Sequence, residues 1–159
     1  VGSEMCIRDR KWTVRISREV QRCEETAKNI GTLCVELKLA GGLDYNKVKG
    51  FKDKQKVTED ARAQFYFAVD QPFRQWLQAI DPEQDDPDEA ALRWQAQARN
   101  IAEKLGKQMV MEAGNAALKG HRIVVDKDKK TERTILYTSP KAYNRFRTRL
   151  WEIYPKTEP

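Results

Sequence analysis

Apolar residues recur at every third or fourth position through four separate stretches of this chain, and an α-helix turns that spacing into one continuous apolar face. The stretches cover roughly residues 17–39, 58–80, 87–120 and 140–154. An amphipathic helix must bury its apolar face against a partner, and 159 residues suffice for one core of moderate size. The sequence therefore predicts an all-α, antiparallel four-helix bundle.

Capping residues indicate where these helices begin and end. Thr58, Asp86 and Ser139 each precede a helical pattern and offer a side-chain oxygen to its first turn. Gly41-Gly42 and Gly120 follow the first and third patterns, and glycine commonly ends a helix. We therefore expect the helix boundaries close to these residues.

Three segments depart from the helical pattern. Nearly alternating lysines between residues 47 and 56 predict a solvated loop before the second helix. Pro72 lies inside the second pattern and lacks the N–H of a helical residue, which predicts a kink near residues 70–71. Between the third and fourth helices, the apolar runs 123–125 and 134–137 flank charged residues, so we expect a short basic hairpin or loop there.

The first ten residues stand apart from these patterns. The string VGSEMCIRDR resembles translated sequencing-adapter read-through, so we interpret residues 1–10 as a non-native leader and residues 11–159 as the bundle. The native chain is then expected to continue upstream as part of a larger subunit. Resequencing the source DNA across the junction of Arg10 and Lys11 would test this interpretation.

Positive charge is concentrated in the last third of the chain, where residues 119–149 alone contribute about as much as the formal net charge of +6. Between residues 119 and 149 ten lysines and arginines face only three acidic residues, which is typical of a surface that meets a polyanion. A solvated face is the other interpretation of the same charges. We expect phosphate contacts from Arg122, Lys127, Lys129, Lys130, Arg133, Arg145 and Arg149.

The sequence offers no group of residues suited to catalysis or metal binding. His121 is the only histidine, and we interpret it as a surface or capping residue. The acidic residues between 81 and 89 lack the alternation and central glycine of a calcium loop. We therefore predict a non-catalytic protein with no cofactor, metal, small-molecule substrate or membrane span.

The cysteines indicate a cellular compartment. Their number is odd, and no signal peptide or zinc-ligand spacing accompanies them. We expect a reducing cytoplasm, in which Cys23 and Cys34 act as small apolar core residues.

Three segments together carry a family resemblance. The first is residues 65–77, with the sequence FYFAVDQPFRQWL. The second combines residues 91–94 with the alanine-rich residues 113–117. The third is residues 137–150, where basic residues alternate with Phe146 and Leu150. In this order they resemble the C-terminal helical bundle of the CasA family, the large subunit of the type I-E CRISPR surveillance complex Cascade. The resemblance implies a non-catalytic subunit fragment that packs against other Cascade subunits with their CRISPR RNA. It also implies that a basic surface holds target or displaced-strand DNA through backbone contacts.

Two other functions fit the same residues. The chain could be a freestanding basic protein that binds nucleic acid without partners, or a structural module that docks a protein through its acidic loop and aromatic helix. The aromatic residues between 65 and 76 have helical spacing, so we expect them in the core rather than stacked on bases.

Overall fold

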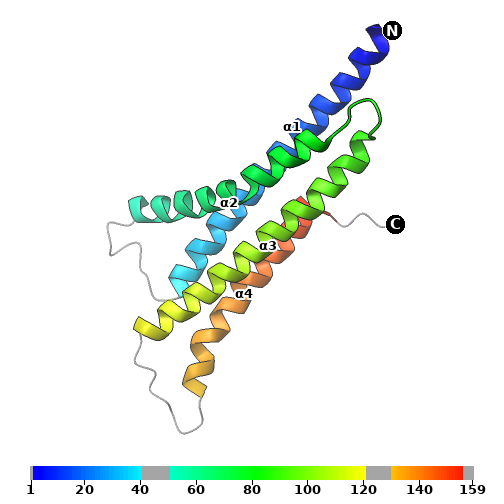
Figure 1. The fold of residues 1–159 in the computed structure, drawn as a ribbon. Helices are drawn as coiled ribbons and strands as arrows, with labels where there is room; N and C mark the ends of the chain where they lie inside the picture. The colour runs from blue at the N-terminus through cyan, green and yellow to red at the C-terminus, as the bar shows by residue number, and fades with distance from the viewer. Residues whose placement is uncertain (1, 41–50, 121–129, 156–159) are drawn as a thin grey trace.

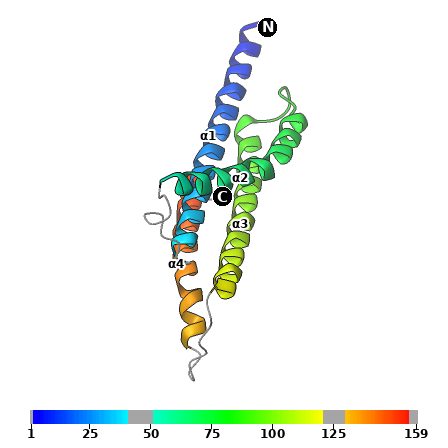
Figure 2. The same cartoon turned by 90° about the vertical axis from the view of Figure 1, so that its left-hand side faces the viewer.

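The computed structural model describes the backbone of residues 2–40, 51–120 and 130–155, and the side chains of 9–39, 53–114 and 141–155. This part of the chain forms α1 (Gly2–Ala40), α2 (Phe51–Ala79), α3 (Pro87–Gly120) and α4 (Lys130–Ile153), and none of it is a strand. Successive helices run in opposite directions (Figures 1 and 2). The predicted all-α, antiparallel four-helix bundle is confirmed.

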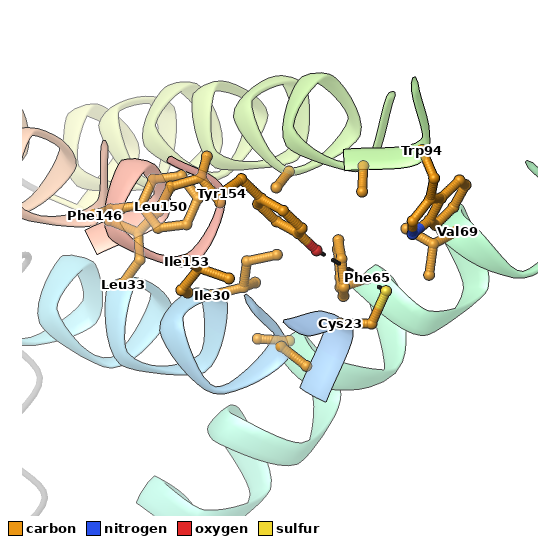
Figure 3. Packing of buried hydrophobic residues seen from close by; sticks show 14 of the residues in the cluster. Cys23, Ile30, Leu33, Phe65, Val69, Trp94, Phe146, Leu150, Ile153 and Tyr154 are labelled. Atoms are coloured by element: carbon orange, nitrogen blue, oxygen red, sulfur yellow. Dashed lines mark hydrogen bonds between the residues drawn. The ribbon is translucent and has the colours of Figure 1, made fainter. Parts of the chain in front are cut away.

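The core is built around α1, which contacts each of the other three helices. Ile30 and Leu33 of α1 are fully buried and lie beside Ile153 and Leu150 of α4 (Figure 3). Phe65 of α2 is also fully buried and approaches α1 near Cys23 (Figure 3). Further buried side chains are Cys23, Ala27 and Leu37 of α1, Ala61 and Val69 of α2, Ala98 and Ala102 of α3, and Ala142 and Phe146 of α4.

The predicted burial of one residue on the apolar face of α1 is wrong. The spacing of Ile16, Val20 and Cys23 places Val20 toward the core, but its side chain is 41% exposed. The neighbouring Glu19 is fully buried instead. A helix face drifts slowly around the axis, so the burial of one position depends on which neighbouring helix stands beside it.

Two aromatic residues of α2, Phe73 and Trp76, meet Trp94 of α3 in one cluster. Phe73 and Trp76 lie 5.1 and 5.7 Å from the ring centroid of Trp94, which is fully buried. Trp76 Nε1 donates a hydrogen bond to the Ala90 carbonyl at 3.0 Å, so its polar atom is satisfied within the core. The expected core role is confirmed for these rings. Tyr66 and Phe67 differ, because their side chains are 38% and 88% exposed.

The start of α3 follows the capping prediction. Asp86 Oδ2 accepts a hydrogen bond from the Glu89 N–H at 3.3 Å, and the Asp86 carbonyl accepts one from the Ala90 N–H at 3.0 Å. The acidic loop before it is tightened by the Asp81 carboxylate, which accepts from the Glu83 N–H at 3.0 Å. Helix α3 reaches Gly120, its predicted end, and residues 121–129 lie outside the described residues.

Two expected helix starts are wrong. Helix α2 begins at Phe51, so Thr58 lies inside it and donates its hydroxyl to the Lys54 carbonyl at 2.9 Å. Helix α4 begins at Lys130, so Ser139 lies inside it as well. Lysine and glutamine are good helix formers, so the lysine-rich segment from residue 51 onward extends α2 rather than forming a loop. Residues 47–50 of that linker lie outside the described residues.

The predicted hairpin before the last helix is contradicted in its second half. Residues 134–137 are helical, whereas the first half, residues 123–125, lies outside the described residues. A two-stranded hairpin is marginal without a packing partner, and β-branched residues cost a helix only about 0.7 kcal/mol each. The helix therefore extends through this short apolar run.

Pro72 is accommodated inside α2, which continues on both sides of it. The helix is visibly bent between its first and second halves (Figures 1 and 2). The ring removes one backbone hydrogen bond and crowds the preceding turn, which explains a bend of this kind. The bend lets the first half of α2 cross α1 while the second half follows α3.

The segment interpreted as a leader is helical from residue 2 onward and continuous with the rest of α1. Helix formation needs no apolar periodicity when good helix formers adjoin an existing helix, because extension costs far less than nucleation. Its non-native origin stays a prediction.

A glycine sets the approach of α3 to α4. A Cβ atom placed on Gly106 would lie 2.5 Å from Cε2 of Phe146 and 3.1 Å from two other atoms of that ring. Phe146 is almost fully buried and closely packed, so moving its ring away from a new Cβ would disturb its neighbours. Gly106 is therefore a packing requirement.

Replacing Gly106 with alanine should lower the free energy of unfolding by about 1–3 kcal/mol, because the new methyl group overpacks the contact with Phe146. The higher helix propensity of alanine should offset about 1 kcal/mol of this loss. Urea unfolding measures this change. In a Phe146→Leu background the same substitution should cost less, because the clashing ring is gone. An equal cost in both backgrounds would show that the ring contact is not the cause.

Candidate nucleic-acid interface

The structure describes only some of the residues expected to contact phosphate. Arg122, Lys127 and Lys129 lie outside the described residues. Lys130 and Arg133 fall in the first turns of α4, and their side chains also lie outside the description. Arg145 and Arg149 are fully described, one helical turn apart on α4.

These two arginines line a groove between α4 and α1, with a volume of about 530 Å³. We call it the α1/α4 groove. Asn29 of α1 ties its two walls together, because Asn29 Nδ2 donates a hydrogen bond to the Phe146 carbonyl at 3.1 Å. The groove is lined by Glu25, Lys28, Asn29, Thr32, Leu33 and Glu36 of α1 and by Ala142, Arg145, Phe146 and Arg149 of α4.

Both arginines of the groove already have carboxylate partners. Arg145 Nη2 lies 3.4 Å from Oε2 of Glu36, and Arg149 Nη1 lies 2.8 Å from Oε2 of Glu152. The arginine side chains are 67% and 56% exposed, respectively, so water and salt screen both pairs. Exposed pairs of this kind are weak, and a phosphate can replace the carboxylate.

Lys28 is a groove cation that sequence reasoning missed. Its side chain is exposed on α1, and it forms no salt bridge with any other described residue. Lys28 precedes Arg145 by more than one hundred residues, so it lies far from the basic last third of the sequence. Only the pairing of α1 with α4 brings the two together.

A second set of basic side chains on α1 meets the acidic start of α3. Arg15 forms an ion pair with Asp88, and Arg10, Lys11 and Arg18 line the same hollow of about 420 Å³. The carboxylates of Asp86 and Asp88 in this hollow disfavour a polyanion. The acidic residues at the start of α3 are therefore neutralised in part by basic side chains of α1.

Comparison with known proteins identifies the family. The chain matches the family model of CRISPR-associated protein Cse1 over residues 4–105, well over half of its length. The chain belongs to the Cse1 family. Cse1 is also called CasA, so the resemblance drawn from the sequence is confirmed. None of the curated proteins compared with it matches.

A solved structure extends the match beyond the family model. The crystal structure of Thermobifida fusca Cse1 has a TM-score of 0.67 and 28% sequence identity to this chain. The match covers 86% of this chain and 22% of the T. fusca protein, so the chain spans about a fifth of that relative. The α1 wall of the groove lies within the family-model match, and the α4 wall lies beyond it.

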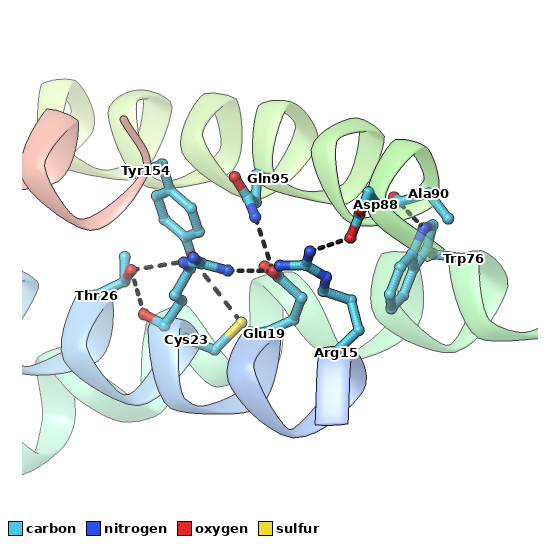
Figure 4. A network of polar contacts seen from close by, with 10 residues as sticks. Arg15, Glu19, Cys23, Thr26, Trp76, Asp88, Ala90, Gln95 and Tyr154 are labelled. Atoms are coloured by element: carbon cyan, nitrogen blue, oxygen red, sulfur yellow. Dashed lines mark hydrogen bonds and ion pairs between the residues drawn. The ribbon is translucent and has the colours of Figure 1, made fainter. Parts of the chain in front are cut away.

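The core of this Cse1-family chain contains a polar network (Figure 4). The buried Glu19 carboxylate accepts a hydrogen bond from Gln95 Nε2 at 2.8 Å and forms an ion pair with Arg22. Burial raises the pKa of Glu19 above its ordinary value of 4.5, and the contacts with Gln95 and Arg22 only partly oppose this effect. Its second oxygen, Oε2, has no hydrogen-bond partner among the described residues.

The same network joins the end of α4 to α1. The Tyr154 hydroxyl donates to Cys23 Sγ at 3.9 Å and lies 3.1 Å from Thr26 Oγ1. Burial raises the pKa of both Tyr154 and Cys23, so the phenol and the thiol stay protonated at neutral pH. Neither is prepared as a nucleophile. Cys23 is free and buried, and Cys34 is free and packs against the core, as predicted.

Two further properties hold for the described part of the chain. No three or more His, Cys, Asp or Glu side chains within it gather in a way that could hold a metal ion. None of its helices is both long and apolar enough to cross a membrane.

Replacing Glu19 with glutamine should stabilise the protein more at pH 7 than at pH 4. The raised pKa means that folded Glu19 binds its proton more tightly than the unfolded chain does. Its contribution to stability is therefore present at low pH and is lost as the pH rises from 4.5 through the raised value. Glutamine does not titrate, so the free energy of unfolding of the variant minus that of the wild type should increase with pH.

Urea unfolding at a series of pH values checks this, with the exposed Glu24→Gln on the same helix as the matched control. A pH-independent difference for Glu19→Gln would mean that the buried carboxylate does not carry the predicted cost.

Proposed function

We propose that this chain is a non-catalytic segment of a Cascade subunit and that its α1/α4 groove holds DNA by the phosphate backbone. One observation supports this most directly: on a Cse1-family bundle, Lys28, Arg145 and Arg149 from two separate helices line one groove. Arginine suits such contacts because its planar guanidinium can donate two parallel hydrogen bonds to a phosphate.

The DNA in this proposal is the target or the strand displaced by the guide RNA. In guide-directed recognition, base pairing supplies sequence specificity, so protein cations need only hold the backbone. The proposed partners are the other Cascade subunits with their CRISPR RNA, in the cytoplasm. The loop and first-turn residues Arg122, Lys127, Lys129, Lys130 and Arg133 remain proposed phosphate contacts.

Changing both groove arginines to glutamine should weaken binding of single-stranded DNA equally for all sequences. Each lost phosphate contact should lower the slope of log affinity against log salt by about 0.7. Fluorescence anisotropy with labelled oligothymidylate and a mixed-sequence strand, at several salt concentrations, measures both effects. Circular dichroism and thermal unfolding check that the Arg145→Gln/Arg149→Gln variant is folded.

The control variant, Arg74→Gln/Lys107→Gln, removes the same charge from exposed positions on α2 and α3. It should lose much less affinity than the groove variant. Equal losses would mean that net charge, not the groove, binds DNA. A loss confined to one sequence would contradict a backbone contact.

Packing against neighbouring subunits is supported by a different surface. Phe67 is 88% exposed and lines an open hollow of about 730 Å³ with Ala63, Ala68 and Leu105. A large aromatic side chain exposed beside other apolar groups is typical of a protein contact.

The Phe67→Ser variant should leave the free energy of unfolding nearly unchanged but reduce incorporation into the complex. Co-purification with the other Cascade subunits measures incorporation, with the exposed Gln64→Ser from the rim of the same hollow as the control. Unchanged incorporation of Phe67→Ser would exclude this surface as the contact.

A further inference from the structure

The cations of the α1/α4 groove differ in what they already contact. Arg145 is held by Glu36 and Arg149 by Glu152, so either guanidinium must exchange a carboxylate for a phosphate. Lys28 has no salt bridge with another described residue, so it can bind a phosphate without giving up a partner. Of the three cations, Lys28 can therefore bind a phosphate at the lowest cost in free energy.

Glu36 opposes binding from the same wall of the groove. Its side chain is 29% exposed, against 67% for Arg145, so it is the better-fixed member of the pair. An incoming phosphate must displace this carboxylate from the guanidinium and also tolerate a like charge nearby. Glu36 is therefore a competitor within the chain for the charge that DNA would use.

Lys28 and Glu36 lie eight residues apart on α1, with Thr32 midway between them, so all three follow one side of the helix. The rise of a helix separates Lys28 from Glu36 by about 12 Å along the groove. Lys28, with Glu25 one turn away, offers a cation at one end of the α1 wall, and Glu36 at the other end restrains the arginine opposite it.

We propose that Lys28 is a third phosphate-binding residue of the groove and that Glu36 limits the affinity of the groove by holding Arg145. This rests on the proposed function, because it takes DNA as the ligand. The α4 arginines then supply only part of the binding charge, and α1 sets how readily the DNA is released.

Two single substitutions in the 159-residue chain should move affinity in opposite directions. Lys28→Gln should weaken binding of labelled oligothymidylate about two- to fivefold and lower the salt slope by about 0.7. Glu36→Gln should tighten binding at low salt, because it frees Arg145 and removes a like charge from the groove. The gain should be only about two- to fivefold, because the lost pair is exposed and weak. This gain should shrink as salt rises.

Matched controls separate these effects from net charge. Lys104→Gln and Glu112→Gln make the same two charge changes at exposed positions on α3. Both controls should bind within about a factor of two of the wild type. Thermal unfolding of all four variants confirms that each is folded.

The outcomes distinguish this inference from the proposed function. If Lys28→Gln matches Lys104→Gln, or Glu36→Gln matches Glu112→Gln, the inference is wrong, even where Arg145→Gln/Arg149→Gln still loses affinity. If the wild type shows no salt-dependent binding, or the arginine variant binds as tightly as the wild type, the proposed function fails and the inference fails with it. Opposite shifts of the two α1 variants beyond their controls establish it.

Discussion

Helix α1 must bury apolar side chains against three other helices at once, and the rest of the bundle depends on how that is achieved. Its inner face is made of Ala27, Ile30 and Leu33, which are almost completely excluded from water. Small residues at the crossings let the helices approach closely: a Cβ on Gly31 would lie 2.8 Å from the Thr58 side chain of α2. A central helix of this kind fixes the position of every neighbour, because each packs on a different side of it.

The same central position explains why α1 carries polar groups into the core. Glu19 faces Gln95 of α3, and Thr26 faces Tyr154 at the end of α4, so each contact joins α1 to a different helix (Figure 4). Burying the Glu19 carboxylate costs stability at neutral pH, but the hydrogen bond to Gln95 is satisfied in only one register of α1 against α3. The network thus favours one alignment of the helices at some expense of stability.

The groove follows directly from the packing of α4 on α1. The apolar face of α4, with Phe146 and Leu150 buried, determines that Arg145 and Arg149 flank the contact with α1. The polar residues of α1 beside its own buried face then meet those arginines, and they include both a cation and two carboxylates. A groove that mixes both signs of charge attracts a polyanion less strongly than a purely basic one.

The periodic apolar residues determined the helix count and most of the core, and Asp86 determined the N-cap of α3, because these depend on interactions within a few residues along the chain. The antiparallel arrangement of the helices was also predicted from the sequence. Sequence reasoning gave the wrong starts for α2 and α4 and a hairpin where residues 134–137 are helical, since weak local preferences yield to extension of an adjoining helix. It singled out Arg145 and Arg149, which line the groove, but it did not single out Lys28, Glu36 or the buried Glu19. Which residues on different helices face one another is not encoded by spacing along one helix. Only the packing of α1 against α3 and α4 decided it.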